Sequence, residues 1–528
     1  MTYAIDFGTS NTVIARWNAA TKQPETVKLA GLSQQIINNP PLIPSLAYIE
    51  DAQTEKILVG QTVRDRGLDL MVDPRFFRGF KRGIGTKIQG FLPELDGQVI
   101  SFEQVGNWYL SNLIRQLQQE NQTEIESLIL TVPVDSFESY RQWLSETCKN
   151  WSIEQVRMLD EPTAAALGYG AIAADSLLVM DFGGGTVDFS LVQLNADNRK
   201  TKNQGFLLKL GDKFLGNSSG QKTKIARVLA KAGANLGGTD LDYWIADYFV
   251  DTLPKSALAT RLAERLKIQL SSQSVATEVY FNDQTFDSYE LSLDQASFKQ
   301  ILEDHHFFAQ LDELMTQVLQ QGRRNGVEVG DIDGVLLVGG TSQIPAVQTW
   351  IGQYFDQTKI RCDRPFEAIA QGALQISQGI EVKDFLYHSY GIRYWNRRQN
   401  VHSWHPLIPS GQAYPMTTPI ELTLGASVEN QPSIELILGE LGTNTGARSV
   451  YFEGDRLLTR SLDREQFTVQ TLNDQAQTIA KLMPLGYPGS DRIKVQFWID
   501  DQRFLRITVE DLLTQQTLLA NQIVTQLS

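Results

Sequence analysis

The chain has 528 residues, of which 42% are hydrophobic and 20% are charged, and this balance excludes an intrinsically disordered protein. A formal net charge of −14 argues against non-specific binding to nucleic acid or to anionic membranes. The two cysteines, Cys148 and Cys362, lie far apart in the sequence, so neither a disulfide framework nor a thiolate metal site is expected.

The N-terminus enters an apolar stretch at residues 3–5 without a preceding basic region, so no signal peptide is expected. No window approaches the run of about 18 uncharged apolar residues that a membrane-spanning helix needs. We therefore expect a cytoplasmic protein. Its length predicts about three or four folding units.

Residues 1–383 mix short strands with amphipathic helices, which predicts an α/β domain. Apolar residues at helical spacing predict helices over residues 103–121, 136–149 and 311–321. Compact apolar runs predict buried parallel strands over residues 128–132, 177–180 and 335–338.

After about residue 390 the pattern changes to short strand-like segments separated by Pro, Gly, Asn or Asp. No long helix is predicted in this part, and the expected strands span 420–424, 433–438, 467–472, 492–499 and 504–510. This pattern predicts an all-β domain over residues 392–528, with a sandwich as the expected architecture. Residues 384–391 are expected to link the two domains.

One glycine-rich turn pattern occurs twice, at Asp6–Thr12 and at Asp181–Asp188. Each copy follows an apolar strand that ends in Asp, turns through Gly and hydroxyl residues, and re-enters a strand pattern. This is typical of a β-hairpin whose turn presents backbone N–H groups and hydroxyls to an anion. A single copy is more often a plain turn, but two matching copies favour a site that grips a polyphosphate from both sides.

Two further glycine clusters stand before helix-like segments. Gly237 and Gly238 precede the segment 241–249, and Gly339 and Gly340 follow the apolar run 335–338. Free N–H groups at a helix start suit an anion, although a tight turn explains either cluster taken alone. Together with the paired hairpins, the clusters make a nucleotide cleft the leading hypothesis.

Residues 159–170 read as a helix with Pro162 in its first turn. Close packing against another element explains the alanines of this segment. Close packing does not explain why residue 161 is a glutamate. A carboxylate near the phosphate hairpins is instead expected to order a water.

These motifs together resemble the nucleotide-binding domain of the seventy-kilodalton heat-shock chaperones, the DnaK-like family, which has the actin and sugar-kinase superfold. The matching segments, in the order of the family, are Asp6–Thr12, Gly60–Gln61, Phe80–Gly85, Thr131–Pro133 with Arg141, Asp160–Gly170, Asp181–Asp188, Glu264–Ser272, Gly339–Pro345 and Glu367–Ala373. The resemblance implies an actin-like ATPase fold of two lobes around a nucleotide cleft, followed by a β-sandwich.

The resemblance also implies Mg²⁺-dependent ATP hydrolysis, with ATP and ADP as ligands. Asp6 and Asp181 would hold Mg²⁺, largely through its waters. Lys81 would neutralise charge that develops on the γ-phosphoryl group and help to place the attacking water. Glu161, Asp181, Thr186 and Asp188 would complete that site. Without the resemblance, Lys81 reads as a solvated lysine in a basic run.

The residues expected to contact the nucleotide fall into three groups. Gly8, Thr9, Ser10 and Asn11 lie on one side of the phosphates, and Gly183, Gly184, Gly185, Gly237 and Gly238 lie on the other. The adenosine contacts implied by the resemblance are Glu264, Lys267, Ser271, Gly339, Gly340 and Gln343.

The resemblance extends to partners. Pro133 and Arg141 would relay the nucleotide state to the β domain. Arg157 would meet a J-domain co-chaperone, although a plain surface arginine is an equally good interpretation, and a nucleotide exchange factor is a further expected partner. Residues after 405 resemble, more weakly, a domain that binds unfolded or extended polypeptide through main-chain hydrogen bonds. Neither nucleic acid nor a membrane is an expected partner.

The sequence departs from the family in three places. The linker contains Phe385–Ser389 where a leucine-rich stretch and an Asp are usual, which puts ATP-driven coupling in question. No helical lid is predicted after the β domain, so fast peptide release is expected. Gln343 stands where many members have a stacking Arg, and Phe366 where they have an Asp, so that Phe366 could stack on the base or simply pack.

The sequence therefore predicts an ATP-hydrolysing chaperone of the DnaK-like type in a lidless form. One alternative is a nucleotide-gated regulator or scaffold of another chaperone, with little hydrolysis of its own. A second alternative is a small-molecule kinase on the same superfold.

Overall fold

The computed structural model describes residues 1–36, 39–86, 92–121, 124–133, 138–170, 176–194, 207–210, 226–281, 286–378, 386, 389–396, 401–409, 412, 414–416, 418–441, 448–453, 456–461, 469–472, 477–500 and 503–527. The chain forms two compact units. The first comprises Met1–Thr201, Leu207–Val382 and Val450–Thr459, and the second comprises Lys202–Phe206, Lys383–Ser449 and Arg460–Ser528. Residues 384, 385, 387 and 388 of the predicted linker lie outside the described residues.

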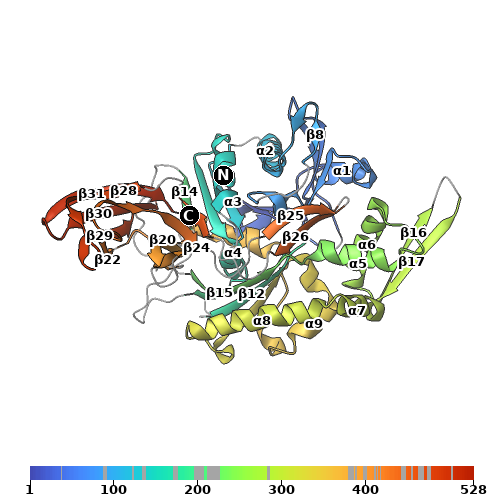
Figure 1. Cartoon of the computed structure of the whole chain (residues 1–528). Coiled ribbons are helices and arrows are strands. Elements are labelled where there is room, and N and C mark those ends of the chain that lie inside the picture. Colours follow the sequence, from blue (N-terminus) through green and yellow to red (C-terminus); the bar gives the residue numbers. More distant parts are fainter. Residues whose placement is uncertain are drawn as a thin grey trace. The chain divides into compact units, whose positions relative to one another are not determined.

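The first large sheet of the first unit is built around the N-terminal strand (Figure 1). Its order is β14 (Leu207–Leu210), β11 (Gln155–Asp160), β10 (Ser127–Val132), β1 (Thr2–Phe7), β2 (Asn11–Asn18) and β3 (Gln23–Thr26), with β4 (Ile43–Pro44) also paired to β2. Strands β1, β10 and β11 run parallel, while β1 and β2 form an antiparallel pair. The carboxyl ends of the three parallel strands therefore meet at one sheet edge.

The second large sheet repeats this plan. Its order is β15 (Ala226–Ala234), β13 (Val187–Leu194), β12 (Ser176–Phe182), β18 (Gly334–Val338) and β19 (Ile360–Arg361). Strand β12 pairs antiparallel with β13 and parallel with β18, as β1 does with β2 and β10. Every residue of β18 is buried, in keeping with its prediction as a parallel strand covered on both faces.

The ten helices described in the first unit are α1 (Gln61–Asp65), α2 (Phe102–Asn121), α3 (Glu138–Lys149), α4 (Glu161–Gly168), α5 (Gly238–Tyr248), α6 (Ala257–Leu270), α7 (Gln295–Asp304), α8 (Phe307–Arg324), α9 (Pro345–Ile351) and α10 (Ala368–Ala373). The helices predicted over 103–121, 136–149, 159–170, 241–249 and 311–321 form within a few residues of those bounds as α2, α3, α4, α5 and α8. Two short 3₁₀ turns matter for the site, η2 (Phe80–Gly83) and η4 (Gly340–Gln343). No helix in the described ranges has the length and apolar character that crossing a bilayer requires.

Three small strand groups complete the first unit. They are the sheet of β6 (Lys56–Val59), β5 (Leu46–Asp51) and β7 (Phe76–Arg78), the pair β8 (Glu94–Leu95) and β9 (Gln98–Val99), and the hairpin β16 (Val275–Phe281) and β17 (Ser288–Asp294). Strands β25 (Arg448–Glu453) and β26 (Arg456–Ser461) also pair with each other.

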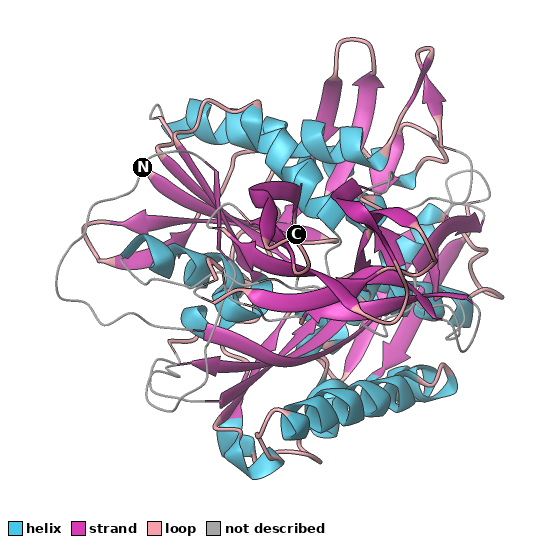
Figure 2. Cartoon of the chain, turned by 60° about the vertical axis from the view of Figure 1, so that its left-hand side comes forward, coloured by secondary structure: helices cyan, strands magenta, loops and turns pink. Residues whose placement is uncertain are grey.

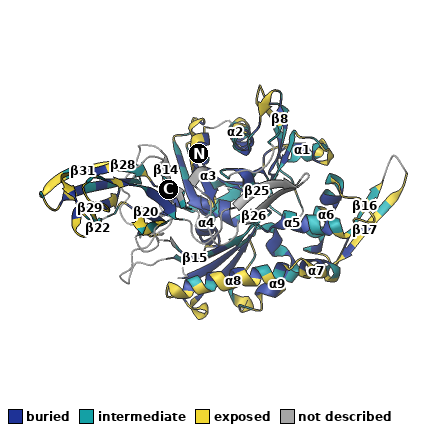
Figure 3. Ribbon diagram, in the orientation of Figure 1, coloured by how far each residue is buried: buried dark blue, intermediate teal, exposed yellow. Residues whose placement is uncertain are grey.

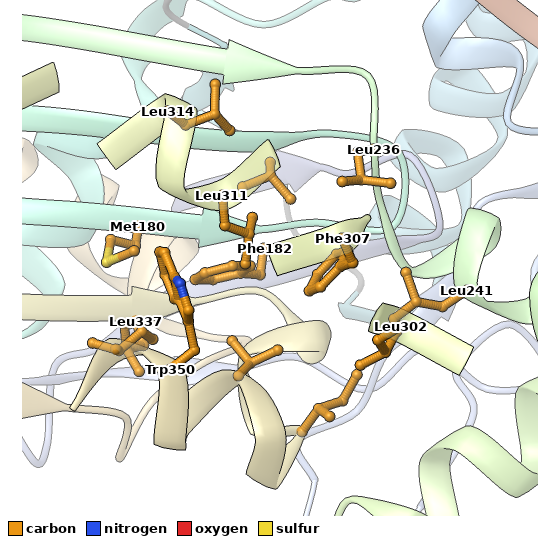
Figure 4. Close-up of a cluster of buried hydrophobic side chains, with 14 of the residues drawn as sticks. Met180, Phe182, Leu236, Leu241, Leu302, Phe307, Leu311, Leu314, Leu337 and Trp350 are labelled. Carbon is orange, nitrogen blue, oxygen red and sulfur yellow. The ribbon is translucent and has the colours of Figure 1, made fainter. Parts of the chain in front are cut away.

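A large apolar cluster supports the second sheet. Strand β12 contributes Met180 and Phe182, α8 contributes Phe307 and Leu311, and α9 contributes Trp350 (Figure 4). These side chains are at most 4% exposed, and strands β12 and β18 of the second sheet are almost entirely buried, while α8 keeps an exposed outer face (Figure 3). The cluster fixes the strand whose end carries Asp181.

Helices α4 and α10 cross at two glycines. A Cβ on Gly168 would lie 2.7 Å from the carbonyl carbon of Ala368, and one on Gly372 would lie 2.9 Å from the carbonyl carbon of Ala164. Because ordinary van der Waals contacts of a Cβ begin near 3.4 Å, only glycine permits this backbone approach. The crossing positions α4, which begins at Glu161.

The second unit consists of strands in the part that the structure describes (Figure 2). One sheet has the order β21 (Val401–Ile408), β20 (Ser389–Asn396), β24 (Leu438–Leu441) and β27 (Val469–Thr471), and another β22 (Ile420–Gly425), β29 (Asp491–Ile499), β30 (Phe504–Asp511) and β31 (Gln516–Gln526). A third pair consists of β23 (Gln431–Leu436) and β28 (Gln477–Gly486). The apolar core of the second unit includes Tyr390, Ile408, Phe497 and Ile507.

The prediction of one strand over 433–438 is wrong. Strand β23 ends at Leu436 and pairs with β28, whereas β24 begins at Leu438 and pairs with β20. The chain thus changes sheet at Ile437, which a continuous apolar alternation does not reveal.

Candidate nucleotide site

The two predicted hairpins form, and their turns close in the same way. The Gly8 N–H donates to the Asn11 carbonyl over 3.1 Å, and the Gly183 N–H donates to the Thr186 carbonyl over 2.9 Å. A Cβ on Gly8 would collide with the Asn11 carbonyl, so this turn requires glycine. The sequence repeat corresponds to a structural repeat.

The structure brings the two turns against each other. A Cβ on Gly184 would collide with the side chain of Ser10, and one on Gly185 would lie 2.7 Å from the Thr9 methyl carbon. The third glycine cluster joins them, because the Gly238 N–H donates to the carbonyl of Gly183 over 3.0 Å. Three glycine segments far apart in the sequence therefore form one surface rich in backbone N–H groups, which suits an anion.

A lysine and a carboxylate meet beside this surface. Lys81, in η2, lies with its Nζ 3.2 Å from Oε1 of Glu161, and the two side chains are 10% and 13% exposed. Asp160 caps α4 by accepting the Thr163 N–H over 2.8 Å, which fixes the start of the helix and hence Glu161. At the adjacent strand end, the Thr131 hydroxyl donates to Asp6 over 2.8 Å.

Partly buried carboxylates gather at the site and raise one another's pKa. Burial raises the pKa of Asp181 well above its ordinary value, and Glu161, Asp188 and Asp6 raise it further. Burial also raises the pKa of Asp6, although Lys81 opposes this effect. Such a cluster favours an added cation.

The donor set fits Mg²⁺, which prefers oxygen ligands and keeps several of its waters. Within the described ranges, no three acidic, His or Cys side chains come close enough to ligate one ion directly. An ion held by Asp6 and Asp181 would be bound mainly through waters and phosphate oxygens, which is the arrangement that the family resemblance implies.

A cavity borders the same carboxylates. Its volume open to water is about 20 Å³, and its lining is Pro133, Glu161, Pro162, Val179, Asp181, Asp188, Phe189, Ser190, Lys231, Ala232, Val338 and Ile369. The cavity connects the predicted water-positioning carboxylates to Pro133, the residue expected to relay the nucleotide state.

The predicted adenosine contacts of α6 are held by protein partners. Glu264 accepts two hydrogen bonds from the Arg64 guanidinium, over 2.7 and 2.9 Å. The Lys267 ammonium donates to the Gly238 carbonyl over 2.7 Å, which places it next to the third glycine cluster. Ser271 caps the C-terminus of α6, and its hydroxyl donates to the Lys267 carbonyl over 3.2 Å.

Lys267 also pairs with the buried carboxylate of Asp242, over 2.6 Å. Burial raises the pKa of Asp242 to about 6, against the lowering effect of Lys267. A further ion pair joins Arg261 to Asp69 over 3.2 Å. Side chains of residues 64–69 are thus tied to α6 by charge.

The fourth glycine cluster forms a turn beside an aromatic ring. Gly339 has a φ of 81°, a conformation that favours glycine, and its N–H donates to the Pro365 carbonyl over 2.7 Å. The next residue, Gly340, begins η4, which ends at Gln343. A Cβ on Gly340 would lie 3.0 Å from the Phe366 ring, and this ring also packs against a buried apolar cluster.

The predicted relay and partner residues occupy different settings. Pro133 lines the cavity with Glu161, and Arg141 of α3 is 1% exposed. Arg157 lies on β11, partly buried, with a long contact of 3.5 Å to Gln155, and burial lowers its pKa.

Two residues at the site were missed by sequence reasoning. Arg82 donates to the Gly185 carbonyl and lies 3.1 Å from Asp240; its position next to Lys81 was the available signal. Tyr140 of α3 lies in the electrostatic surroundings of Lys81, and burial raises its pKa to about 12. Its helical spacing indicated only a core position.

The chain matches a known protein family. The family model described as Hsp70 protein matches residues 87–216 and 223–392, more than half of the chain. The matched ranges contain Glu161, Asp181 and Asp188, whereas the first hairpin and Lys81 lie before them. The first hairpin and Lys81 belong to the site because Ser10 lies against Gly184 and Lys81 pairs with Glu161.

Proposed function

The chain belongs to the Hsp70 family of chaperones, and from this premise we propose that it is a DnaK-like chaperone that couples ATP hydrolysis to the binding of unfolded polypeptide. At the level of the family, its members are ATPases that bind ATP or ADP with Mg²⁺ and that bind unfolded polypeptide and co-chaperones. The observation that carries the proposal is the convergence of two glycine hairpins on the Lys81–Glu161 pair.

Each phosphate contact has a stated role in this proposal. The turn of Thr9, Ser10 and Asn11 holds the β- and γ-phosphates on one side, and Gly183–Gly185 holds them on the other through backbone N–H groups. Mg²⁺, when bound by Asp6 and Asp181, supplies charge neutralisation between the phosphates.

Lys81 stabilises the negative charge that develops on the γ-phosphoryl group during its transfer. Glu161 accepts a hydrogen bond from the attacking water, and Thr186 and Asp188 orient the water from the opposite hairpin. Burial raises the pKa of Glu161, its pairing with Lys81 at 3.2 Å opposes that rise, and the role of Glu161 is to position the water. We therefore expect slow intrinsic hydrolysis that depends on positioning.

The second unit is proposed to bind an extended peptide. Its described residues form several antiparallel sheets over one apolar core, an arrangement compatible with the β-sandwich predicted from the sequence. An added peptide strand would gain main-chain hydrogen bonds at a sheet edge. A J-domain contact at Arg157, an exchange factor and a cytoplasmic location are further parts of this proposal.

A second candidate function is a nucleotide-gated regulator of another chaperone. The observation that favours it is the wall at η4, where Phe366 lies against Gly340 and an amide, Gln343, follows. Because Gln343 stands where the resemblance implies a stacking Arg, nucleotide affinity and turnover would differ from those of an ordinary chaperone.

The test is single-turnover hydrolysis of ATP by the full chain, with and without an unfolded peptide. Acceleration by peptide would support the coupled chaperone, and hydrolysis indifferent to peptide and to a J-domain protein would support the regulator. Lys81→Ala should abolish turnover but leave nucleotide binding largely intact. Lys299→Ala, at an exposed α7 position, is the matched control, and equal loss of binding and turnover in Lys81→Ala would refute the role of Lys81.

A further inference from the structure

A lysine that no motif singled out lies on the catalytic face of the second sheet. In the β-sheet register, Asp181 of β12 is opposite Asp188 of β13, and Ser190 of β13 is opposite Lys231 of β15. Side chains of directly paired residues, and of residues two apart on one strand, point to the same face. Asp181, Asp188 and Lys231 therefore share one face across three adjacent strands.

The cavity at the site confirms this placement independently. Asp181, Asp188, Ser190 and Lys231 all contribute to its lining, and Glu161 of α4 lines it as well. The room for water centres, about 20 Å³, exceeds the roughly 10–15 Å³ that one water needs. Polar groups on several sides give such a water the partners it requires.

The charges around the cavity are unbalanced without Lys231. Three carboxylates line it, Glu161, Asp181 and Asp188, and among the lining residues that the structure describes Lys231 contributes the cation. Lys81 reaches Glu161 but does not line the cavity. An ammonium is a compact, strongly hydrated charge with three donors, so it can both offset the carboxylates and hold a water.

We propose that Lys231 is a positioning residue for hydrolysis, which holds the water in this cavity and orients it between Glu161 and Asp188. This inference rests on the proposed ATPase function. The backbone of Lys231 is fixed as well, because its N–H donates to the Gln321 side chain of α8 over 3.1 Å. Strand β15 thereby adds an ammonium to the cavity that Glu161 also lines.

The first test separates hydrolysis from binding. Lys231→Met keeps the length of the side chain and removes its charge, and we expect single-turnover hydrolysis to fall by roughly 10- to 100-fold, while MgATP binds no more weakly. Lys231→Ala should behave alike, and ethylammonium added to Lys231→Ala should restore part of the rate, because the amine fits the space that is vacated. It should not restore Lys231→Met, where the side chain still fills that space.

Lys299→Met is the matched control, since Lys299 is 56% exposed and pairs with Glu303 on the same exposed face of α7. Wild-type hydrolysis in Lys231→Met would overturn the proposal. A loss of rate that accompanies a loss of thermal stability and resists ethylammonium would also overturn it, because the role would then be structural.

A second measurement does not depend on hydrolysis. Mn²⁺ binding to the nucleotide-free protein, followed by electron paramagnetic resonance, should be at least about threefold tighter in Lys231→Met, because a positive charge has left the carboxylate cluster. If the wild type failed to hydrolyse ATP, the proposed function would fall, and this comparison would still decide the placement of Lys231. Equal Mn²⁺ affinity in the wild type and in Lys231→Met would refute the placement of Lys231 beside the carboxylates.

Discussion

The crossing of α4 and α10 provides the sharpest test of how the fold positions Glu161. In Gly372→Ala the new Cβ would lie 2.9 Å from the Ala164 carbonyl carbon, against an ordinary limit near 3.4 Å, and closer still to the carbonyl oxygen. The backbones must therefore separate by at least about 0.5 Å. Because the obstacle is backbone and not a flexible side chain, we expect the upper part of the overpacking range, about 3 kcal/mol.

This destabilisation can be converted into a thermal shift. An unfolding entropy of about 2.1 cal/mol/K per residue over a unit of roughly 380 residues gives about 0.8 kcal/mol/K, so that 3 kcal/mol lowers Tm by about 4 °C. Glu161 begins α4, so the same displacement should slow single-turnover hydrolysis by about 10-fold or more, since a misplacement of about 1 Å can cost 100-fold.

The control is Gly330→Ala. A Cβ at Gly330 would meet nothing within 4 Å, so this exposed substitution should leave both Tm and hydrolysis near the wild type. Scanning calorimetry and rapid-quench hydrolysis measure the two effects. If Gly372→Ala melts and hydrolyses like Gly330→Ala, then the helix crossing does not set the position of Glu161.

Three further changes test other contacts. Arg64→Gln removes the double hydrogen bond to Glu264 and should speed nucleotide release about 5- to 30-fold in stopped-flow experiments; an unchanged rate would contradict a role of this pair in retention. Asp511→Asn breaks the buried pair with Arg492, 2.8 Å apart, and should cost about 3–5 kcal/mol of stability at pH 7. Burial alone would raise the pKa of Asp511, but hydrogen bonds from Arg492 and from two backbone N–H groups lower it below the ordinary 3.8. The stabilisation is thus present above pH 3.8 and lost as the pH falls through the folded-state pKa, so a denaturation difference that persists in strong acid would refute it. Tyr140 has a buried hydroxyl without a hydrogen-bond partner among the described residues, so Tyr140→Phe should leave Tm unchanged or higher; a clear drop in Tm would show that the hydroxyl is satisfied.

The local parts of this fold were predictable from sequence because they follow short-range rules. The hairpin at Asp6–Thr12 and the one at Asp181–Asp188 carry a turn signature between apolar strands, and both form. Strand β10 and strand β18 were visible as compact apolar runs. The pairing of β14 with β11 was not, because an edge strand depends on which distant segment reaches it.

Long-range charge pairing limited the prediction of the site in the same way. Lys81 was assigned only through family resemblance, and its contact with Glu161 joins residues 80 positions apart. Lys231 lies in a strand where a lysine usually faces solvent, and only the register of three strands places it with the carboxylates. An alternating sequence pattern predicts which residues of a strand share a face, but only the fold shows which other residues pack against that face.

The ion pairs around the nucleotide site suggest how it opens. Residues 64, 69 and 82 each pair with a residue of the segment 240–264, through Arg64–Glu264, Arg261–Asp69 and Arg82–Asp240. Charged pairs that are partly exposed weaken with added salt, whereas apolar contacts do not. The exposed fractions of these six side chains run from 9% to 21%, so screening reaches them in part. If these pairs hold the site closed, the rate of nucleotide release must rise with ionic strength. Arg64→Gln must then raise the release rate at low salt and also make that rate less sensitive to added salt.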